Sequence, residues 1–225
     1  PWLFGEEAVA VCRFFAKWKA HLMPYLYGLA AEAHEQGIPM MRAMALEFPG
    51  DLGAEGCDRQ YMLGDGLLVA PVMRADNIGE FYLPDGVWTH LFTGERMDGG
   101  RWYRAEYDFF SLPLFVRENT LLPLGDTDAT PDYAFERNVT LRLYALTDAA
   151  ERIVRNRLGQ PAFSVRAERN GNQVSMLVEG SAEGLRIQLM GVQAVDALTG
   201  AQAVPAPEGL LLTVRAQELR FSLPS

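Results

Sequence analysis

The chain has 225 residues, 49% of them hydrophobic, and carries a formal net charge of −9. This length and apolar content are enough to bury a sizeable core, in one large domain or two small ones. Because phosphate neutralisation needs a face rich in Lys and Arg, the acidic balance excludes nucleic-acid binding. No apolar run approaches the roughly 20 residues that span a bilayer, so we expect no membrane partner.

The cysteines and histidines indicate neither a disulfide framework nor a metal site. Cys12 and Cys57 are far apart and belong to no CxxC motif, which favours a reducing compartment, and we expect a cytoplasmic location. His21, His34 and His90 are scattered over different predicted elements without metal-ligand spacing, so surface or half-buried positions are favoured for them. We therefore expect no metal and no cofactor.

A long helix is predicted from Glu6 towards Gly37. Glu6 and Glu7 supply the acidic first turn that suits the positive end of a helix dipole. Pro24 lacks a backbone donor and should kink or restart the helix, and Gly37 should end it. The apolar face of the first half repeats at three- and four-residue spacing and consists of Val9, Cys12, Phe15, Trp18 and Leu22.

The segment that follows this helix looks like part of a larger α/β fold. Ile38 to Phe48 is nearly continuously apolar, which predicts a strand buried on both faces, as in a parallel sheet. Asp58 to Leu63 is interpreted as a short helix. Helix, strand and helix in this order are typical of the last part of a (β/α)8 barrel whose other strands lie outside this chain. The alternative is a small free-standing α+β domain.

The rest of the chain is a series of short β-type runs separated by turn residues. Their spacing of eight to twelve residues predicts β-sandwiches. Leu141 to Tyr144 is expected to close the first sandwich, and Asn170-Gly171 predicts a two-residue hairpin loop in the second. The predicted fold is thus α+β, with the last helix, strand and helix of a (β/α)8 barrel in residues 1–65 and all-β sandwiches in residues 66–148 and 149–225.

Three polar residues near the end of the presumed barrel strand are the candidate substrate-binding residues. They are Arg42, Glu47 and Asp51, because active sites of barrels form where the strands end. A single strand offers no second acid for catalysis. The favoured interpretation is that Arg42 forms an ion pair with Glu47 or Asp51.

The middle of the chain is rich in aromatic residues that could stack on sugar rings. Packing in a sandwich core or at a domain interface is the favoured role, for Trp88 and Trp102 in particular. The full set is Trp88, Phe92, Trp102, Tyr103, Tyr107, Phe109 and Phe110.

The order of these segments resembles a known family. MPYLYGLAAEAHEQGIPMMRAMALEFPGD, RQYMLGDGLLVAPV, FYLPDGVWTHLFTGE and FFSLPLFVRENTLLPLG are together similar to the C-terminal part of glycoside hydrolase family 31, and most of all to its bacterial α-xylosidases. The similarity is specific from about Pro1 to Asp132. It implies a barrel end followed by a proximal and a distal β-sandwich.

The resemblance also implies an activity and its limits. Family members cleave α-glycosidic bonds with retention, using one aspartate as nucleophile and another as acid/base, and both lie on earlier barrel strands. Neither motif is present here, so no catalytic residue is assigned and the chain alone is expected to be inactive. The implied partners are the rest of the catalytic barrel and, in the complete enzyme, a small oligosaccharide.

Other functions remain open at this point. One is an α-glucosidase of the same family, and another is a stand-alone carbohydrate-binding β-sandwich module. A third is a scaffold for subunit contacts in a homo-oligomer.

Overall fold

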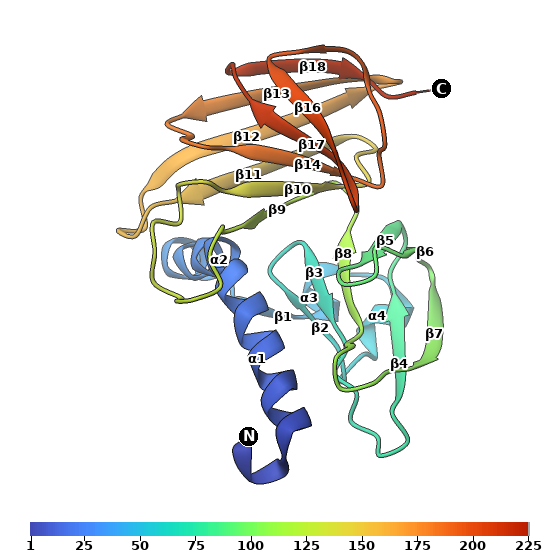
Figure 1. Cartoon of the computed structure of the whole chain (residues 1–225). Helices are drawn as coiled ribbons and strands as arrows, with labels where there is room; N and C mark the ends of the chain where they lie inside the picture. The colour runs from blue at the N-terminus through green and yellow to red at the C-terminus, as the bar shows by residue number, and fades with distance from the viewer. Residues whose placement is uncertain (225) are drawn as a thin grey trace. The chain divides into compact units, whose positions relative to one another are not determined.

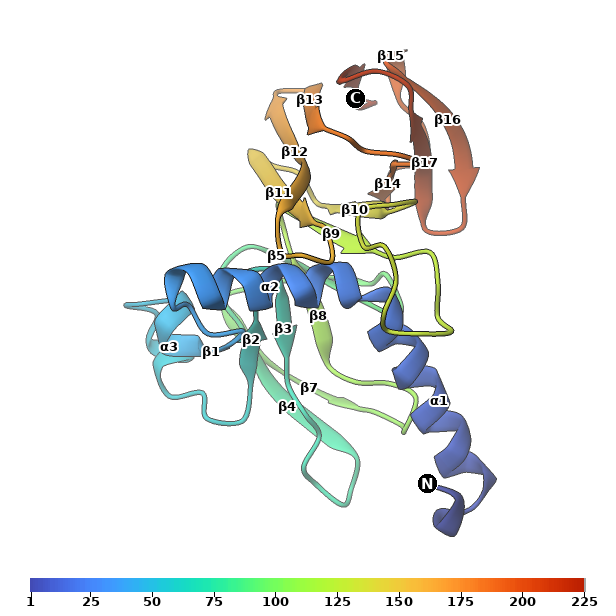
Figure 2. The same cartoon turned by 90° about the vertical axis from the view of Figure 1, so that its left-hand side faces the viewer.

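The computed structural model describes residues 1–224 and consists mostly of β-strands, with few helices (Figures 1 and 2). It packs as two compact units. Unit 1 contains residues 1–14 and 37–118, and unit 2 contains residues 15–36 and the chain from Asn119 onward. The β-rich architecture agrees with the predicted sandwiches, and the described residues contain no closed (β/α)8 barrel. The domain boundaries at residues 65 and 148 stay a prediction.

The N-terminal helices begin and end where the sequence indicates. A single 3-10 turn, η1 (Trp2–Phe4), precedes α1 (Glu6–His21) and α2 (Met23–Gln36). Pro24 lies in the first turn of α2, where a backbone N–H would have no acceptor within the helix, so proline costs no hydrogen bond there. Gly37 follows α2 with a φ of 74°, a left-handed conformation that glycine adopts without strain. The predicted restart and stop are both confirmed.

The predicted buried parallel strand at Ile38–Phe48 is wrong. Only β1 (Met41–Ala43) is a strand, and it pairs antiparallel with β2 (Tyr61–Leu63) at the edge of a sheet. Helix α3 (Met44–Glu47) takes the remainder of the apolar run. The periodicity of a short apolar run does not distinguish a strand from a helix. Here, pairing with β2 makes residues 41–43 a strand.

The predicted helix at Asp58–Leu63 is also wrong, because the short helix lies earlier, at α4 (Leu52–Glu55). Asp51 caps α4, and its Oδ1 accepts hydrogen bonds from the backbone N–H groups of Gly53 at 2.9 Å and Ala54 at 3.3 Å. Tyr61 to Leu63 instead pairs with a strand on each side.

Unit 1 is built on a six-stranded antiparallel sheet and a two-stranded ribbon. The sheet order is β1-β2-β3-β8-β5-β6, and β4 pairs with β7 alone (Figure 1). Phe81 of β4 and Phe115 of β8 are fully buried, with ring centroids 4.9 Å apart in the core. The strands not yet given are β3 (Leu67–Val69), β4 (Ile78–Leu83), β5 (Val87–His90), β6 (Arg96–Asp98), β7 (Arg101–Glu106) and β8 (Leu114–Arg117).

Unit 2 is a β-sandwich of two five-stranded sheets, which face each other in Figure 2. Their orders are β16-β17-β14-β10-β9 and β11-β12-β13-β18-β15. The first sheet contains β9 (Thr120–Leu124), β10 (Thr140–Tyr144), β14 (Arg186–Met190), β16 (Ala201–Ala206) and β17 (Gly209–Val214). The second contains β11 (Ala149–Arg155), β12 (Pro161–Asn170), β13 (Gln173–Gly180), β15 (Asp196–Thr199) and β18 (Glu218–Ser222).

Alternating apolar residues of both sheets form the core of unit 2. Leu141 and Leu143 of β10 belong to this core, so β10 lies in the sheet of unit 2, although the sequence places it in the middle sandwich. The predicted hairpin between β12 and β13 is confirmed with a shift of one residue, since Asn170 pairs with Gln173. The loop is therefore Gly171-Asn172, and Gly171 has the positive φ of 60° that the first position of a type II′ turn requires.

Helical residues 15–36 pack within unit 2. The guanidinium of Arg155 donates to both carboxylate oxygens of Glu35, at 2.8 and 2.7 Å. The hydroxyl of Tyr133 donates to the carbonyl of Ala20 at 2.7 Å, and the hydroxyl of Tyr27 donates to the carbonyl of Arg157 at 2.8 Å. Residues 15–36 and the sandwich therefore form one packed body.

Candidate functional site

Arg42 and Glu47 form a largely buried ion pair. The middle position of β1 directs Arg42 inward, and its Nη1 donates to Glu47 Oε1 at 2.7 Å. Its Nε donates to the carbonyl of Pro39 at 3.0 Å, and the two charged side chains are only 6% and 17% exposed. The predicted ion pair is confirmed with Glu47 as the partner. Truncating Arg42 would leave the largely buried carboxylate of Glu47 without this cation, which is destabilising.

Asp51, the third candidate, accepts hydrogen bonds from backbone N–H groups and from a tyrosine hydroxyl. Besides capping α4, its carboxylate accepts the hydroxyl of Tyr82 at 3.0 and 3.2 Å. Burial, followed by this hydrogen bond, raises the pKa of Tyr82. Burial and the nearby charge of Asp51 also raise the pKa of the Cys57 thiol, which keeps that thiol protonated at neutral pH. Asp51 thus joins α4 to β4 and is not a partner of Arg42.

A buried glutamine holds the same tyrosine from its backbone side. Gln60 Nε2 donates to the Tyr82 carbonyl at 2.8 Å, and Gln60 Oε1 accepts the Tyr82 backbone N–H at 2.7 Å. The side-chain amide of Gln60 therefore satisfies the backbone N–H and carbonyl of Tyr82, as a neighbouring strand would do. Sequence reasoning missed both residues, because no local motif marks a glutamine that pairs with a backbone 22 residues away.

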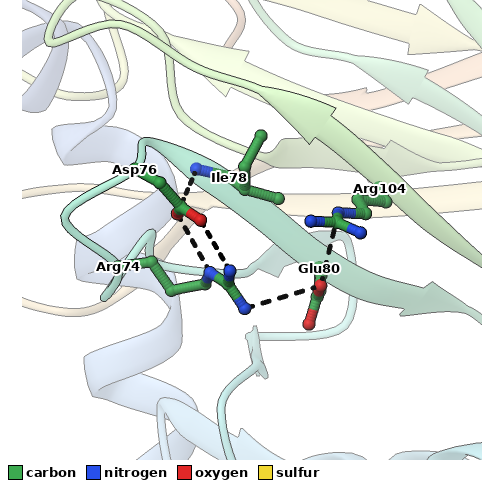
Figure 3. A network of polar contacts seen from close by, with 5 residues as sticks. All are labelled: Arg74, Asp76, Ile78, Glu80 and Arg104. Atoms are coloured by element: carbon green, nitrogen blue, oxygen red, sulfur yellow. Dashed lines mark hydrogen bonds and ion pairs between the residues drawn. The ribbon is translucent and has the colours of Figure 1, made fainter.

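A second polar cluster, also missed, lies at the start of β4 (Figure 3). Arg74 donates to both oxygens of Asp76, at 3.0 and 2.6 Å, and Asp76 Oδ1 accepts the backbone N–H of Ile78 at 3.2 Å. Glu80 Oε1 lies 3.7 Å from Arg74 Nη1 and 3.5 Å from Arg104 Nε. The hydrogen bond from Arg74 is the main reason that the pKa of Asp76 falls to about 2. The cluster is exposed, so it adds little to stability.

The aromatic residues of unit 1 divide into buried and exposed groups. Trp88 is fully buried and donates from Nε1 to the carbonyl of Pro84 at 2.7 Å, which confirms its packing role. Tyr103 and Tyr107 pack against the core, and burial raises the pKa of Tyr107 to about 12. Trp102 is 59% exposed, so it does not pack in the core of unit 1, and packing at a domain interface stays a prediction for it.

The remaining aromatic residues of that set lie nearer the surface. Phe109 and Phe110 are 67% and 40% exposed, and Phe92 is partly buried against His90. His21, His34 and His90 lie in separate elements, and within residues 1–224 no three His, Cys, Asp or Glu side chains form a group that could hold a metal ion. None of the described helices is both long and apolar enough to cross a membrane.

Two family models match successive parts of the chain. Residues 37–122 match the glycosyl hydrolase family 31 C-terminal domain, and residues 133–224 match the C-terminal domain of α-xylosidase YicI. With the β-rich fold, these matches define a class, the C-terminal β-domains of carbohydrate-cleaving enzymes. The chain belongs to glycoside hydrolase family 31.

Individual proteins agree with this assignment. An α-xylosidase of Emericella nidulans is 40% identical over 133 residues, which cover 56% of this chain and 17% of that protein. Alpha-glucosidase 2 of Bacillus thermoamyloliquefaciens is 31% identical over 145 residues, which cover 64% of this chain and 18% of that protein. The chain thus spans less than a fifth of either relative.

A solved structure supports the fold. The family 31 dextranase of Flavobacterium johnsoniae, complexed with glucose, aligns with a TM-score of 0.82 and 21% identity. The alignment covers 100% of this chain and 34% of the dextranase. At this identity the likeness shows the fold alone.

Proposed function

We propose that the chain is the C-terminal portion of a retaining α-xylosidase, which releases non-reducing terminal α-xylosyl residues from oligosaccharides. The observation that carries the proposal is the match of residues 133–224 to an α-xylosidase C-terminal domain. The 40% identity to a fungal α-xylosidase supports the same substrate class.

The role proposed for this portion is support of the catalytic domain. Retention requires two carboxyl groups about 5 Å apart in one pocket, and both must be free to react with the substrate. Glu47 is paired with Arg42, and Asp51 is held by α4 and Tyr82, so neither carboxylate is available for this chemistry. The catalytic aspartates would come from a (β/α)8 barrel elsewhere in the polypeptide, and residues 1–65 would pack against that barrel as its closing segment.

An assay on two aryl glycosides tests the proposal. The 225-residue chain should not hydrolyse 4-nitrophenyl α-D-xylopyranoside, because it lacks the paired acids. A longer polypeptide that contains both this chain and a barrel should hydrolyse it with a higher kcat/KM than 4-nitrophenyl α-D-glucopyranoside. Repurified chain that still turns over the xyloside would contradict the supporting role.

The second candidate is an α-glucosidase of the same family, which the similarity to the Bacillus α-glucosidase favours. A reversed preference between the two aryl glycosides in the longer polypeptide would select it over the α-xylosidase.

A further inference from the structure

One face of the β4–β7 ribbon carries an exposed tryptophan, Trp102, for which the supporting role proposed above does not account. In an antiparallel pair, residues opposite each other lie on the same face. Tyr82 lies opposite Trp102, and Glu80 lies opposite Arg104. The other face carries Phe81, whose ring is buried in the core of unit 1. We call the face with Tyr82, Trp102, Glu80 and Arg104 the ribbon face.

Trp102 provides an exposed aromatic surface on a fixed base. Its ring lies beside that of Tyr82, with centroids 5.6 Å apart and an interplanar angle of 48°. Tyr82 is itself held by Asp51 at its hydroxyl and by Gln60 at its backbone. Because the base is held at both ends, a ligand that stacks on Trp102 would need little reordering of the protein.

Planar polar groups lie next to this ring on the same face. Arg104 follows Trp102 by two positions, which is about 7 Å along a strand. The side chain of Arg104 is 64% exposed and its Nε lies 3.5 Å from Oε1 of Glu80, which also faces Arg74 (Figure 3). Arg74 and Arg104 balance Asp76 and Glu80 in formal charge, and Glu106, opposite Ile78 on the same face, adds one negative charge. The face therefore suits a neutral ligand with many hydroxyl groups better than an anion.

We propose that the ribbon face binds an oligosaccharide outside the catalytic pocket. One pyranose ring would lie on Trp102, whose electron-rich face attracts the partly positive CH groups of a sugar. Hydroxyl groups of the same or the next sugar would accept from the guanidinium of Arg104 and donate to the carboxylate of Glu80, as planar groups allow.

Membership of family 31 supplies the ligand class, and the inference does not depend on a preference for xylosides. A carbohydrate-cleaving enzyme gains from a second contact with its substrate because the effective concentration near the active site rises.

Isothermal titration calorimetry on the 225-residue chain tests the inference, with maltotriose and a xyloglucan heptasaccharide as probes. The wild-type chain should bind at least one of them. Trp102→Ala should weaken that binding about tenfold or more, as truncation of a central interface aromatic does, and Trp102→Phe should restore part of it. Arg104→Ala should weaken the same binding without changing the melting temperature.

The matched control is Trp2→Ala, since Trp2 is 79% exposed but lies in η1, away from the ribbon face in sequence and element. This variant should bind as the wild type does. Absence of binding to both probes at millimolar concentration, or equal affinity of the Trp102→Ala and wild-type chains, would overturn the inference. A failed xyloside assay would leave these titrations unchanged, so the two proposals are tested separately.

Discussion

Trp88 and Trp102 lie in different sheets of unit 1, in β5 and β7, and occupy opposite environments. Trp88 is fully buried and hydrogen-bonded, whereas Trp102 is 59% exposed. Sequence reasoning gave both residues the same packing role, because both follow turn residues and begin short strands. Only the register between β4 and β7 places Trp102 on the outer face. Exposure of a single residue in a short strand is therefore a property of the tertiary pairing.

We predict that the two truncations differ in their effect on stability. Trp88→Ala should lower the free energy of unfolding by about 3 to 5 kcal/mol, through lost transfer energy and a cavity. Trp102→Ala should change it by no more than about 0.5 kcal/mol, as at most surface positions. Urea unfolding of both variants checks this, with the m-value as the control for an unchanged transition. Equal losses would show that Trp102 packs in a core.

His90 makes the stability of unit 1 depend on pH. The ring is 5% exposed, with Nε2 3.0 Å from the Leu112 carbonyl and Nδ1 3.2 Å from the Thr93 backbone N–H. A neutral ring satisfies both contacts by donating from Nε2 and accepting at Nδ1. Burial lowers the pKa of His90, against smaller opposing effects of the Leu112 hydrogen bond and the charge of Glu95.

The direction of the pH effect follows from this lowered pKa. The unfolded chain takes up its proton near pH 6.5, above the folded-state pKa, so the stabilising contribution is present above that pH and lost as the pH falls towards the folded-state pKa. We predict that the free energy of unfolding decreases more between pH 7.5 and 5.5 in the wild type than in His90→Gln. His34→Gln, at an exposed site, should keep the wild-type slope. Parallel slopes for wild type and His90→Gln would contradict the prediction.

At the scale of elements, α4 depends on a glycine that touches an aromatic ring. A Cβ added at Gly53 would collide with the ring of Tyr82, whereas a Cβ at Gly56 would meet nothing within 4 Å. Because Tyr82 is held by Asp51 and Gln60, its ring cannot move aside easily. Close contact between α4 and β4 therefore requires glycine at position 53.

We predict that Gly53→Ala lowers the free energy of unfolding by about 1 to 3 kcal/mol, the usual cost of overpacking. Gly56→Ala is the matched control and should change it by less than about 1 kcal/mol. Thermal and urea unfolding of the two variants give the comparison. A neutral Gly53→Ala variant would mean that Tyr82 has freedom to shift.

Predictions from the sequence succeed where a single residue has a local effect. Pro24 and Gly37 act through their own backbone dihedral angles, and both mark helix ends in the structure. The spacing of Arg42 and Glu47 likewise places their charges within reach of each other. The predictions fail where pairing between distant strands decides the secondary structure. Tyr61–Leu63, for example, is predicted as a helix but forms a strand that pairs with a neighbour on each side. The ribbon face depends on a register that links β4 to β7, and no local pattern encodes that register.

At the scale of the whole molecule, unit 1 exposes several large apolar side chains. Soluble monomers rarely expose large contiguous apolar patches, so such residues indicate a surface that another segment or partner covers. The residues before β2 that are more than half exposed are Trp2, Leu3, Phe4, Met41, Leu46 and Leu52.

We predict that the isolated chain binds a hydrophobic dye through this surface. The double variant Leu46→Gln/Leu52→Gln should bind less dye and unfold at nearly the same urea concentration, because both side chains are exposed. Leu158→Gln, at an 80% exposed position in unit 2, is the control and should leave dye binding unchanged. A longer polypeptide with a barrel should bind less dye than the chain. Equal dye fluorescence from the chain and the longer polypeptide would argue against coverage.

The discontinuous make-up of unit 2 sets the order in which the chain can fold during synthesis. Residues 15–36 leave the ribosome before all of residues 37–118, yet their packing partners begin at Asn119. Residues 37–118 of unit 1 are thus inserted between the two segments of unit 2. The β-strands of this insertion can pair before the sandwich that packs on residues 15–36 has been synthesised. Closing so long an insertion costs little more entropy than closing a short one, because that cost grows only with the logarithm of length. The delay has the larger effect, since the apolar face of α2 stays uncovered until its contact strands β9 and β11 have been synthesised.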